Sequence, residues 1–291
     1  MAVWQSIGNG IRTASRRPRM LVDLWLINLV FALLVVGPFF ALFKADLGHS
    51  LLGRDLRPLN PAWLGDVIYR YQDMAPAALA LAAAAVLLYL VLYVFLNGGI
   101  IGRLLDKEEG EGTAAPRLFL ADCGRYFWRF ARLFLLSLVF YAVALGAVPG
   151  ALSAILKPVT ENARTAWTIF WISNLRTVVA LLLVSLVHLI FDYARIVVVV
   201  REERRVLHAL GAAFAFIGKR FFRAWSLSLL ITAGFLAGTG LYLFTRQFMP
   251  DTGLFWLGLA LVWEQAFILF RLWTKMIYFS AQADYYGSRS Y

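Results

Sequence analysis

Residues Thr177–Val200 read TVVALLLVSLVHLIFDYARIVVVV, and the basic run REERR (Arg201–Arg205) follows them directly. A helix needs about 20 mainly apolar residues to cross the hydrocarbon core of a bilayer, and this stretch is long enough. Lysine and arginine are favoured in the loops that remain on the cytoplasmic side. The sequence therefore predicts a transmembrane helix that ends at the cytoplasmic surface.

Five further stretches have the same character, and together they decide the class of protein. The chain of 291 residues is 61% hydrophobic and 15% charged, whereas about a quarter of the residues in an average soluble domain are charged. No segment alternates apolar and polar residues with the period of two that a membrane β-barrel requires. We predict an all-α polytopic membrane helix bundle, a single integral membrane domain over residues 1–291, with six spans at Met20–Phe43, Pro76–Ile101, Ala131–Leu156, Thr177–Val200, Ala224–Thr245 and Gly253–Phe270.

The basic residues are distributed unevenly between the two sides of this bundle. Of the 28 lysines and arginines, 20 lie on the side that holds both termini. The positive-inside rule therefore predicts that both termini face the cytoplasm, at the inner membrane of a bacterium. The loops also account for the net charge of +11. We expect no nucleic-acid partner, because a nucleic-acid-binding domain would not carry this much uninterrupted apolar sequence.

A short amphipathic segment precedes the first, third and fifth spans on the predicted cytoplasmic side. Apolar residues recur there at intervals of three and four, which is typical of a helix with one apolar face. Such helices lie in the membrane surface with the apolar face toward the lipid. The apolar residues are Trp4, Ile7 and Ile11 in the first segment, Phe119, Cys123 and Phe130 in the second, and Leu207, Leu210, Phe214, Ile217 and Phe221 in the third.

The other faces of these segments and the residues beside them are basic. We expect them to bind anionic lipid headgroups, with a membrane-protein partner or a second copy of the chain as alternatives. The order of surface helix, span, outer loop and span occurs three times, which predicts a hairpin pseudo-repeat over residues 3–101, 116–200 and 206–283. The basic residues concerned are Arg16, Arg17, Arg19, Arg125, Arg129, Arg132, Arg204, Arg205, Lys219, Arg220 and Arg223.

Ionisable residues also lie within or beside two of the spans, where they are costly and usually have a role. Spacings of four and three place those of the fourth span on one face of a helix. Those of the last span are separated by seven and four residues. This candidate polar cluster comprises His188, Asp192 and Arg195 from the fourth span, and Glu264, Arg271 and Lys275 from the last.

Two interpretations of the polar cluster remain open. In one, a polar path or pocket lies between the two helices, and Glu264 or Asp192 carries protons or a cation. In the other, the charges near the span ends extend to the membrane surface, and Glu264 has one partner inside the bundle.

Small residues recur at intervals of four in two spans. Gly146 and Gly150 lie in the third span, and Gly234 and Gly238 lie in the fifth. This spacing lets two helix backbones approach closely, either within one chain or between copies. Pro149 is expected to kink the third span.

No catalytic motif accompanies these features. The sequence contains no HExxH, CxxC, GxSxG or P-loop pattern, and its one cysteine, Cys123, excludes an intrachain disulfide. We therefore expect no catalytic residues, no metal site and no cofactor. The preferred hypothesis is a non-enzymatic structural, accessory or assembly component of a membrane complex, or a lipid-organising protein. One alternative is a transporter or permease component that uses Glu264 and Asp192. Another is an intramembrane lipid-modifying enzyme with His188 and Asp192 as general acid and base.

Two strings, GRYFWRFARL (Gly124–Leu133) and FDYARIVVVVREERR (Phe191–Arg205), carry a family resemblance. They resemble a group of uncharacterised bacterial inner-membrane proteins with about six spans. The plan of the chain is also loosely similar to the membrane domain attached to some glycerophosphodiester phosphodiesterases. The chain lacks their phosphodiesterase domain, so the resemblance implies a membrane architecture and not that activity.

Overall fold

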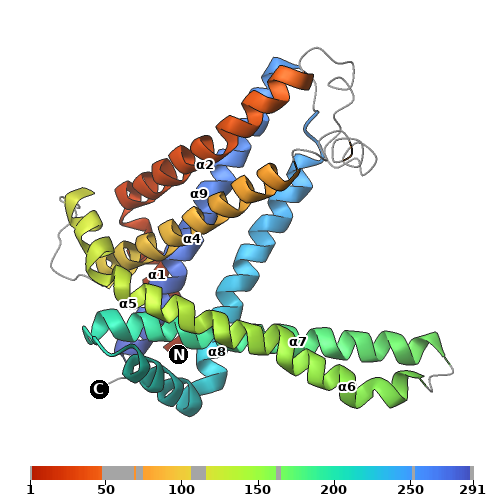
Figure 1. Ribbon diagram of the computed structural model, residues 1–291. Helices are drawn as coiled ribbons and strands as arrows, with labels where there is room; N and C mark the ends of the chain where they lie inside the picture. The colour runs from red at the N-terminus through yellow and green to blue at the C-terminus, as the bar shows by residue number, and fades with distance from the viewer. Residues whose placement is uncertain are drawn as a thin grey trace. The chain divides into compact units, whose positions relative to one another are not determined.

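The computed structural model describes residues 2–47, 69, 75–105, 116–161, 165–250 and 253–288. All regular secondary structure in this part of the chain is helical (Figure 1). Its elements are α1 (Ala2–Ser15), α2 (Pro18–Leu47), α4 (Ala75–Leu105), α5 (Pro116–Ala142), the π-helical segment η2 (Val143–Ala147), α6 (Val148–Glu161), α7 (Ala166–Val200), α8 (Val206–Arg246) and α9 (Leu254–Gly287).

The prediction of an all-α protein with six spans is confirmed. Six helices are long and apolar enough to cross a membrane, with α5, η2 and α6 together forming the third of them. Five of the predicted spans lie within these helices, and the sixth, Gly253–Phe270, begins one residue before α9, at its N-cap. The chain is therefore a multi-pass membrane protein by the length and composition of its helices.

The helices belong to two compact units. Unit 1 comprises Met1–Leu21 and Val94–Tyr291, and unit 2 comprises Val22–Tyr93. Within unit 2, the rings of Phe31 on α2 and Tyr89 on α4 are 5.7 Å apart. The single domain over the whole chain and the hairpin pseudo-repeat remain predictions.

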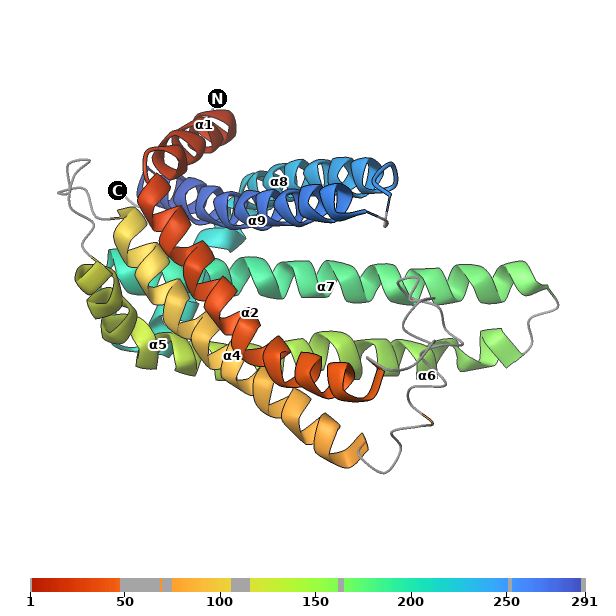
Figure 2. The same ribbon diagram turned by 90° about the horizontal axis from the view of Figure 1, so that it is seen from above.

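The C-terminal half of α7 forms the centre of unit 1. Every residue from Leu189 to Val199 is buried, and α7 packs against α5, α6, α8 and α9 (Figures 1 and 2). An α-helix that is apolar all round is suited to such a fully enclosed position. Phe191 illustrates the packing, because its ring lies edge-on to that of Phe140 on α5 at 5.4 Å.

Stacked aromatic rings join the last two spans. Phe235 on α8 stacks on Phe270 of α9 at 6.2 Å, and Tyr242 stacks on Phe267 at 4.2 Å. Figure 2 shows α8 and α9 side by side. Because these rings are large and rigid, they fix the rotation of α9 about its own axis relative to α8.

The third span changes its helical geometry immediately before Pro149. The π-helical segment η2 ends at Ala147, and α6 continues from Val148. Proline has no N–H and its ring clashes with the carbonyl of the residue four positions earlier, here Leu145, which lies in η2. A π-helical turn accommodates this interruption. The irregularity expected at Pro149 is thus present as a π-bulge.

Two close helix contacts in unit 1 involve glycines other than the predicted ones. A Cβ atom on Gly99 of α4 would collide with Cys123 and Phe119 of α5. Similarly, a Cβ atom on Gly10 of α1 would lie 2.8 Å from the Cβ of Ala281 on α9. Only glycine allows these backbones to approach so closely.

Of the four glycines singled out in the sequence, one has this role in the described chain. Gly238 faces the ring of Phe270, whereas a Cβ on Gly146, Gly150 or Gly234 would meet no atom of the described residues within 4 Å. Packing within the chain therefore explains Gly238, and the expectation that it explains the other three is wrong for the residues described here.

The amphipathic segments before the spans are helical, but their apolar faces are used differently from the prediction. Phe119, Cys123 and Phe130 are buried inside unit 1, and so are Leu210 and Ile217. The prediction that these five side chains face lipid is wrong, because the segments pack on neighbouring helices of the same chain. The side chains that are exposed include Trp4, Ile11, Leu207 and Phe214.

The surface segments differ in how they join their spans. The chain leaves helical geometry between α1 and α2, and α8 is interrupted at Arg220, with φ −141° and ψ 30°. Figures 1 and 2 show the first turns of α5 running at an angle to the rest of that helix. Each segment therefore has a direction of its own.

Replacing Gly99 by valine should disrupt the contact between α4 and α5. The added side chain would overlap Cys123 and Phe119, and overpacking of this kind costs about 1–3 kcal/mol. We expect a lower melting temperature and aggregation of the detergent-solubilised protein in size-exclusion chromatography. Gly234→Val is the matched control, since its side chain enters open space. Equal melting temperatures for the two variants would contradict the contact.

Candidate functional site

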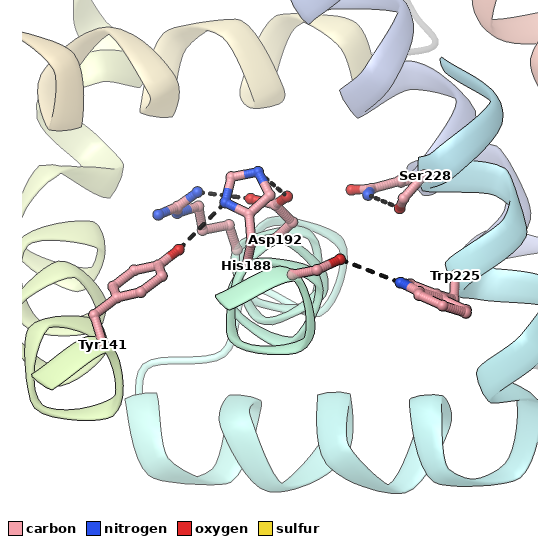
Figure 3. Close-up of polar contacts among 8 residues, drawn as sticks. Tyr141, His188, Asp192, Trp225 and Ser228 are labelled. Atoms are coloured by element: carbon pink, nitrogen blue, oxygen red, sulfur yellow. Dashed lines mark hydrogen bonds and ion pairs between the residues drawn. The ribbon is translucent and has the colours of Figure 1, made fainter. Parts of the chain in front are cut away.

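The C-terminal half of α7 carries the most buried charges in unit 1. Asp192 is 1% exposed, and its Oδ1 accepts a hydrogen bond of 2.8 Å from the Arg195 guanidinium. Its Oδ2 lies 3.2 Å from Nε2 of His188. The spacing of three and four residues thus brings His188, Asp192 and Arg195 together, as the sequence predicts (Figure 3).

Three neighbouring helices supply polar partners to this group. The Tyr141 hydroxyl of α5 is 3.3 Å from Nδ1 of His188. The Tyr278 hydroxyl of α9 lies within hydrogen-bonding reach of Asp192, Ser228 and Gln282. Gln282 of α9 in turn donates a hydrogen bond of 3.2 Å to Ser228 Oγ of α8. Figure 3 shows Tyr141 and Ser228 on opposite sides of α7.

The last span brings one of its three predicted residues to this group. Lys275 interacts electrostatically with Asp192 and Arg195. Arg271 is exposed and interacts with Lys275, and Glu264 is exposed about two helical turns earlier on α9. Among the described residues of unit 1, no hydrogen bond or ion pair joins Glu264 to Asp192. The structure thus brings together four of the six residues of the predicted polar cluster.

Some polar contacts in unit 1 are not indicated by the sequence. Tyr141 and Tyr278 belong to helices other than α7, and nothing in their local sequence distinguishes them from other tyrosines. Arg103 of α4 forms an ion pair of 3.1 Å with Asp122 of α5. The side chain of Arg17 also donates to the backbone carbonyl of Arg103. A charge in the last turn of a span is common enough that its sequence gives no sign of such pairing.

The three surface segments and the end of α9 lie together at one end of unit 1. We call this the basic end, and it comprises α1 with the following residues 16–19, residues 116–132 of α5, the loop 201–205, residues 206–223 of α8 and the last turns of α9 (Figure 1). Asn9 of α1 donates a hydrogen bond of 3.2 Å to Asp284 of α9, and Trp273 donates one of 3.2 Å to Ser15. The predicted basic residues are therefore held on one connected surface.

The loop 201–205 is fixed to α5 through Glu202. This residue has a left-handed backbone, with φ 50°, which is uncommon for a residue other than glycine. Its carboxylate accepts a hydrogen bond of 2.7 Å from Arg125, and its carbonyl accepts one of 3.3 Å from Arg129. Two arginines of α5 therefore hold the turn that connects α7 to α8.

The next residue of this loop, Glu203, lies just before the start of α8. The carboxylate of Glu203 accepts hydrogen bonds from the backbone N–H of Arg205 and from His208, at 3.2 and 3.0 Å. These bonds lower the pKa of the Glu203 carboxyl below its ordinary value. A carboxylate at this position also satisfies an otherwise unpaired N–H of the first helical turn.

Most of the basic residues of the predicted set are available on the surface. Arg17, Arg129 and Arg220 are half-buried, and the other eight are exposed. Arg220 lies over the ring of Phe216 at 5.3 Å, a cation–π contact. The others present their charge where α1, α5 and α8 meet the surroundings of the protein.

No protein-family model, curated protein or solved structure that was compared with the chain matches it. The resemblance to six-span bacterial inner-membrane proteins therefore remains a prediction. What the site can do must be argued from its own residues.

Removing the Asp192 carboxylate should leave the Arg195 charge buried and uncompensated. We expect Asp192→Leu to destabilise the protein by about 3–5 kcal/mol, measured by unfolding in mixed micelles. The double variant Asp192→Leu/Arg195→Met should recover much of this loss, because no charge then remains unpaired. Glu161→Leu is the control, since Glu161 forms an exposed ion pair with Lys157. A double variant as unstable as Asp192→Leu would show that the pairing is not the cause.

Proposed function

We propose that this chain is a non-enzymatic multi-pass membrane protein whose basic end binds anionic phospholipid headgroups and organises lipid at the membrane surface. The observation that carries the proposal is the grouping of basic residues from α1, α5 and α8 at one end of unit 1. Juxtamembrane clusters of lysine and arginine attract anionic lipid in proportion to their charge.

The basic end also carries exposed aromatic residues, which supports a position in the membrane surface. Trp4 of α1 is 69% exposed and Trp128 of α5 is 70% exposed. Phe222 lies just beyond the break in α8 and is exposed as well. Basic side chains beside exposed tryptophan and phenylalanine are typical of helices that lie at the level of the headgroups.

Several of these cations have no carboxylate within ion-pair distance in the described part of the chain. Arg132, Lys219 and Arg223 are examples, and all three are exposed. Glu202 is already bound by Arg125 and Glu203 by His208. The positive charge of the basic end is therefore only partly neutralised by the protein's own carboxylates. A bound phosphate group would neutralise more of it.

The alternatives from the sequence receive less support from the geometry. A path that uses both Glu264 and Asp192 requires these residues to share one polar region, and they do not do so within unit 1. A membrane-protein partner or a second copy at the basic end would use the same cations. Binding of such a protein can be distinguished from binding of lipid by measuring the response to anionic lipid.

We further propose that the chain resides in a bacterial inner membrane with the basic end on the cytoplasmic side. The described ends of the chain, at α1 and at the C-terminus of α9, both lie at the basic end (Figure 1). A chain with an even number of spans has both of its ends on the same side of the membrane. The excess of basic residues then assigns that end to the cytoplasm.

This orientation can be tested with two engineered cysteines at opposite ends of the last span. Phe248 and Ser288 are both exposed, and native Cys123 is buried. In spheroplasts, a membrane-impermeant maleimide should label Phe248→Cys and leave Ser288→Cys unlabelled until the membrane is permeabilised. The reverse pattern would place the basic end outside. The parent protein controls for labelling of Cys123.

Lipid binding can be tested by removing two exposed charges from the basic end. Lys219→Gln/Arg223→Gln should weaken the thermal stabilisation of the purified protein by phosphatidylglycerol, by about fivefold in lipid concentration for each charge removed. Phosphatidylcholine should act equally on parent and variant.

The control for this experiment is Lys157→Gln/Arg176→Gln. It removes two exposed charges from those parts of α6 and α7 that lie away from the basic end. It should respond to phosphatidylglycerol like the parent. If both double variants respond like the parent, the basic end does not bind anionic lipid. Loss of a co-purifying protein with unchanged lipid response would favour a protein partner instead.

A further inference from the structure

Four of the buried oxygen atoms in the core of unit 1 have hydrogen-bonding capacity that the described residues leave unfilled. They are Oε1 of Gln282, the hydroxyls of Tyr193 and Tyr285, and Oδ2 of Asp192, which faces Nε2 of His188. All four residues are almost completely buried, with exposed fractions of 0 or 1%. None of these groups is part of the lipid-binding surface proposed above.

The four atoms belong to one region between α7, α8 and α9. The Tyr193 hydroxyl interacts electrostatically with Tyr285, Tyr278 and Asp192. Tyr278 also reaches Gln282 and Ser228. The ring of Phe216 covers the region from α8, at 5.2 Å from Tyr193 and 5.9 Å from Tyr285.

Burial without a partner is unfavourable for each of these atoms. A buried polar group that makes no hydrogen bond costs about 1–3 kcal/mol, so the amide oxygen and the two hydroxyls together would offset much of the stability of an ordinary domain. Native proteins bind ordered water at such places, where several polar groups converge. Three hydroxyls, an amide and a carboxylate can bind a short chain of water molecules.

One residue connects this region with the surface of α7. His188 is 51% exposed at its side chain, whereas Asp192 is 1% exposed, and their Nε2 and Oδ2 atoms are 3.2 Å apart. Histidine is the side chain whose charge changes most readily near neutral pH. The pair therefore links a side chain at the surface of α7 with a buried carboxylate.

We propose that His188, Asp192 and water bound beside Tyr193, Tyr278 and Gln282 form a proton relay from the surface of α7 into the core of unit 1. In the inward step, the Nε2 proton of the His188 imidazolium passes to Oδ2 of Asp192. This leaves a neutral imidazole and a neutral carboxylic acid. The carboxylic acid then donates a hydrogen bond to the water beside it, and return of the proton from Oδ2 to Nε2 restores the carboxylate and the imidazolium.

Charged and titratable groups of three helices face the pair. On α7, Arg195 donates to Asp192 Oδ1, and on α9 Lys275 adds positive charge nearby. Tyr141 of α5 lies beside His188, and Tyr278 of α9 faces both members of the pair. The proton transfer therefore takes place among groups from α5, α7 and α9.

The relay can be followed by infrared spectroscopy of the full-length protein in phosphatidylcholine liposomes, with isotope-labelled aspartate and a rapid change of pH. We expect a protonated-carboxyl signal that appears on acidification and is absent from Asp192→Asn. His188→Gln retains a hydrogen-bonding side chain but cannot take up a proton. It should slow this signal about a hundredfold, a typical effect of losing a general acid or base.

His208→Gln is the matched control, because His208 is exposed and pairs with Glu203 at the basic end. It should leave the rate unchanged. If acidification gives no signal that depends on Asp192, or if His188→Gln titrates as fast as the parent protein, the relay does not exist. Neither result bears on lipid binding, since the liposomes contain no anionic lipid.

The bound water can be tested separately through the two tyrosines. Tyr193→Phe and Tyr285→Phe remove hydroxyls that would lose a water partner, so each should lower the melting temperature. A hydroxyl without any partner would instead give a higher melting temperature when removed, which would overturn the proposed water site. Tyr242→Phe, in the aromatic stack of α8 and α9, is the control for removing a hydroxyl elsewhere.

Discussion

The arrangement of unit 1 depends on one buried pair of opposite charges, Asp192 and Arg195. Removing an ion from water costs several kcal/mol even in a relaxed protein interior, so this segment of α7 must be enclosed by groups that compensate both charges. His188 and Tyr278 contribute on the side of the carboxylate. The helices that carry these groups are consequently held at fixed rotations about α7.

How much the sequence predicts depends on whether a feature is local. The six spans follow from composition alone, and the common face of His188, Asp192 and Arg195 follows from the helical repeat. Glu264 and Arg271 also share a face, being seven residues apart, but both are exposed. The rotation of α9 is set by ring contacts such as Phe235 with Phe270. Those contacts join residues far apart in the chain, which a periodic pattern cannot specify.

The same limit applies to close helix packing. The spacing of four between glycines predicts close approach for Gly146, Gly150, Gly234 and Gly238, yet in the described chain only Gly238 has a neighbour. The adjacent Gly98 and Gly99 also make a close contact, with α5, which this spacing does not predict. Small residues permit a backbone to approach, but the partner must be present at the same depth. The surface segments show this too, because side chains such as Phe119, Cys123 and Ile217 pack inside the chain.

Arginine serves two different purposes within one stretch of α7. Arg195 is 8% exposed and bound to Asp192, whereas Arg201 is exposed and lies over the ring of Tyr286 at 5.7 Å. The two are six residues apart, about 9 Å along a helix. Over that distance the surroundings change from a closed core to the basic end. A positively charged residue near a span end can thus belong to either environment, and its acidic neighbours decide which. Asp192 lies one turn before Arg195 on the same face, while Glu202 and Glu203 are committed to other partners. For this reason the charge of Arg195 belongs to the buried polar cluster, and the charge of Arg201 belongs to the basic end.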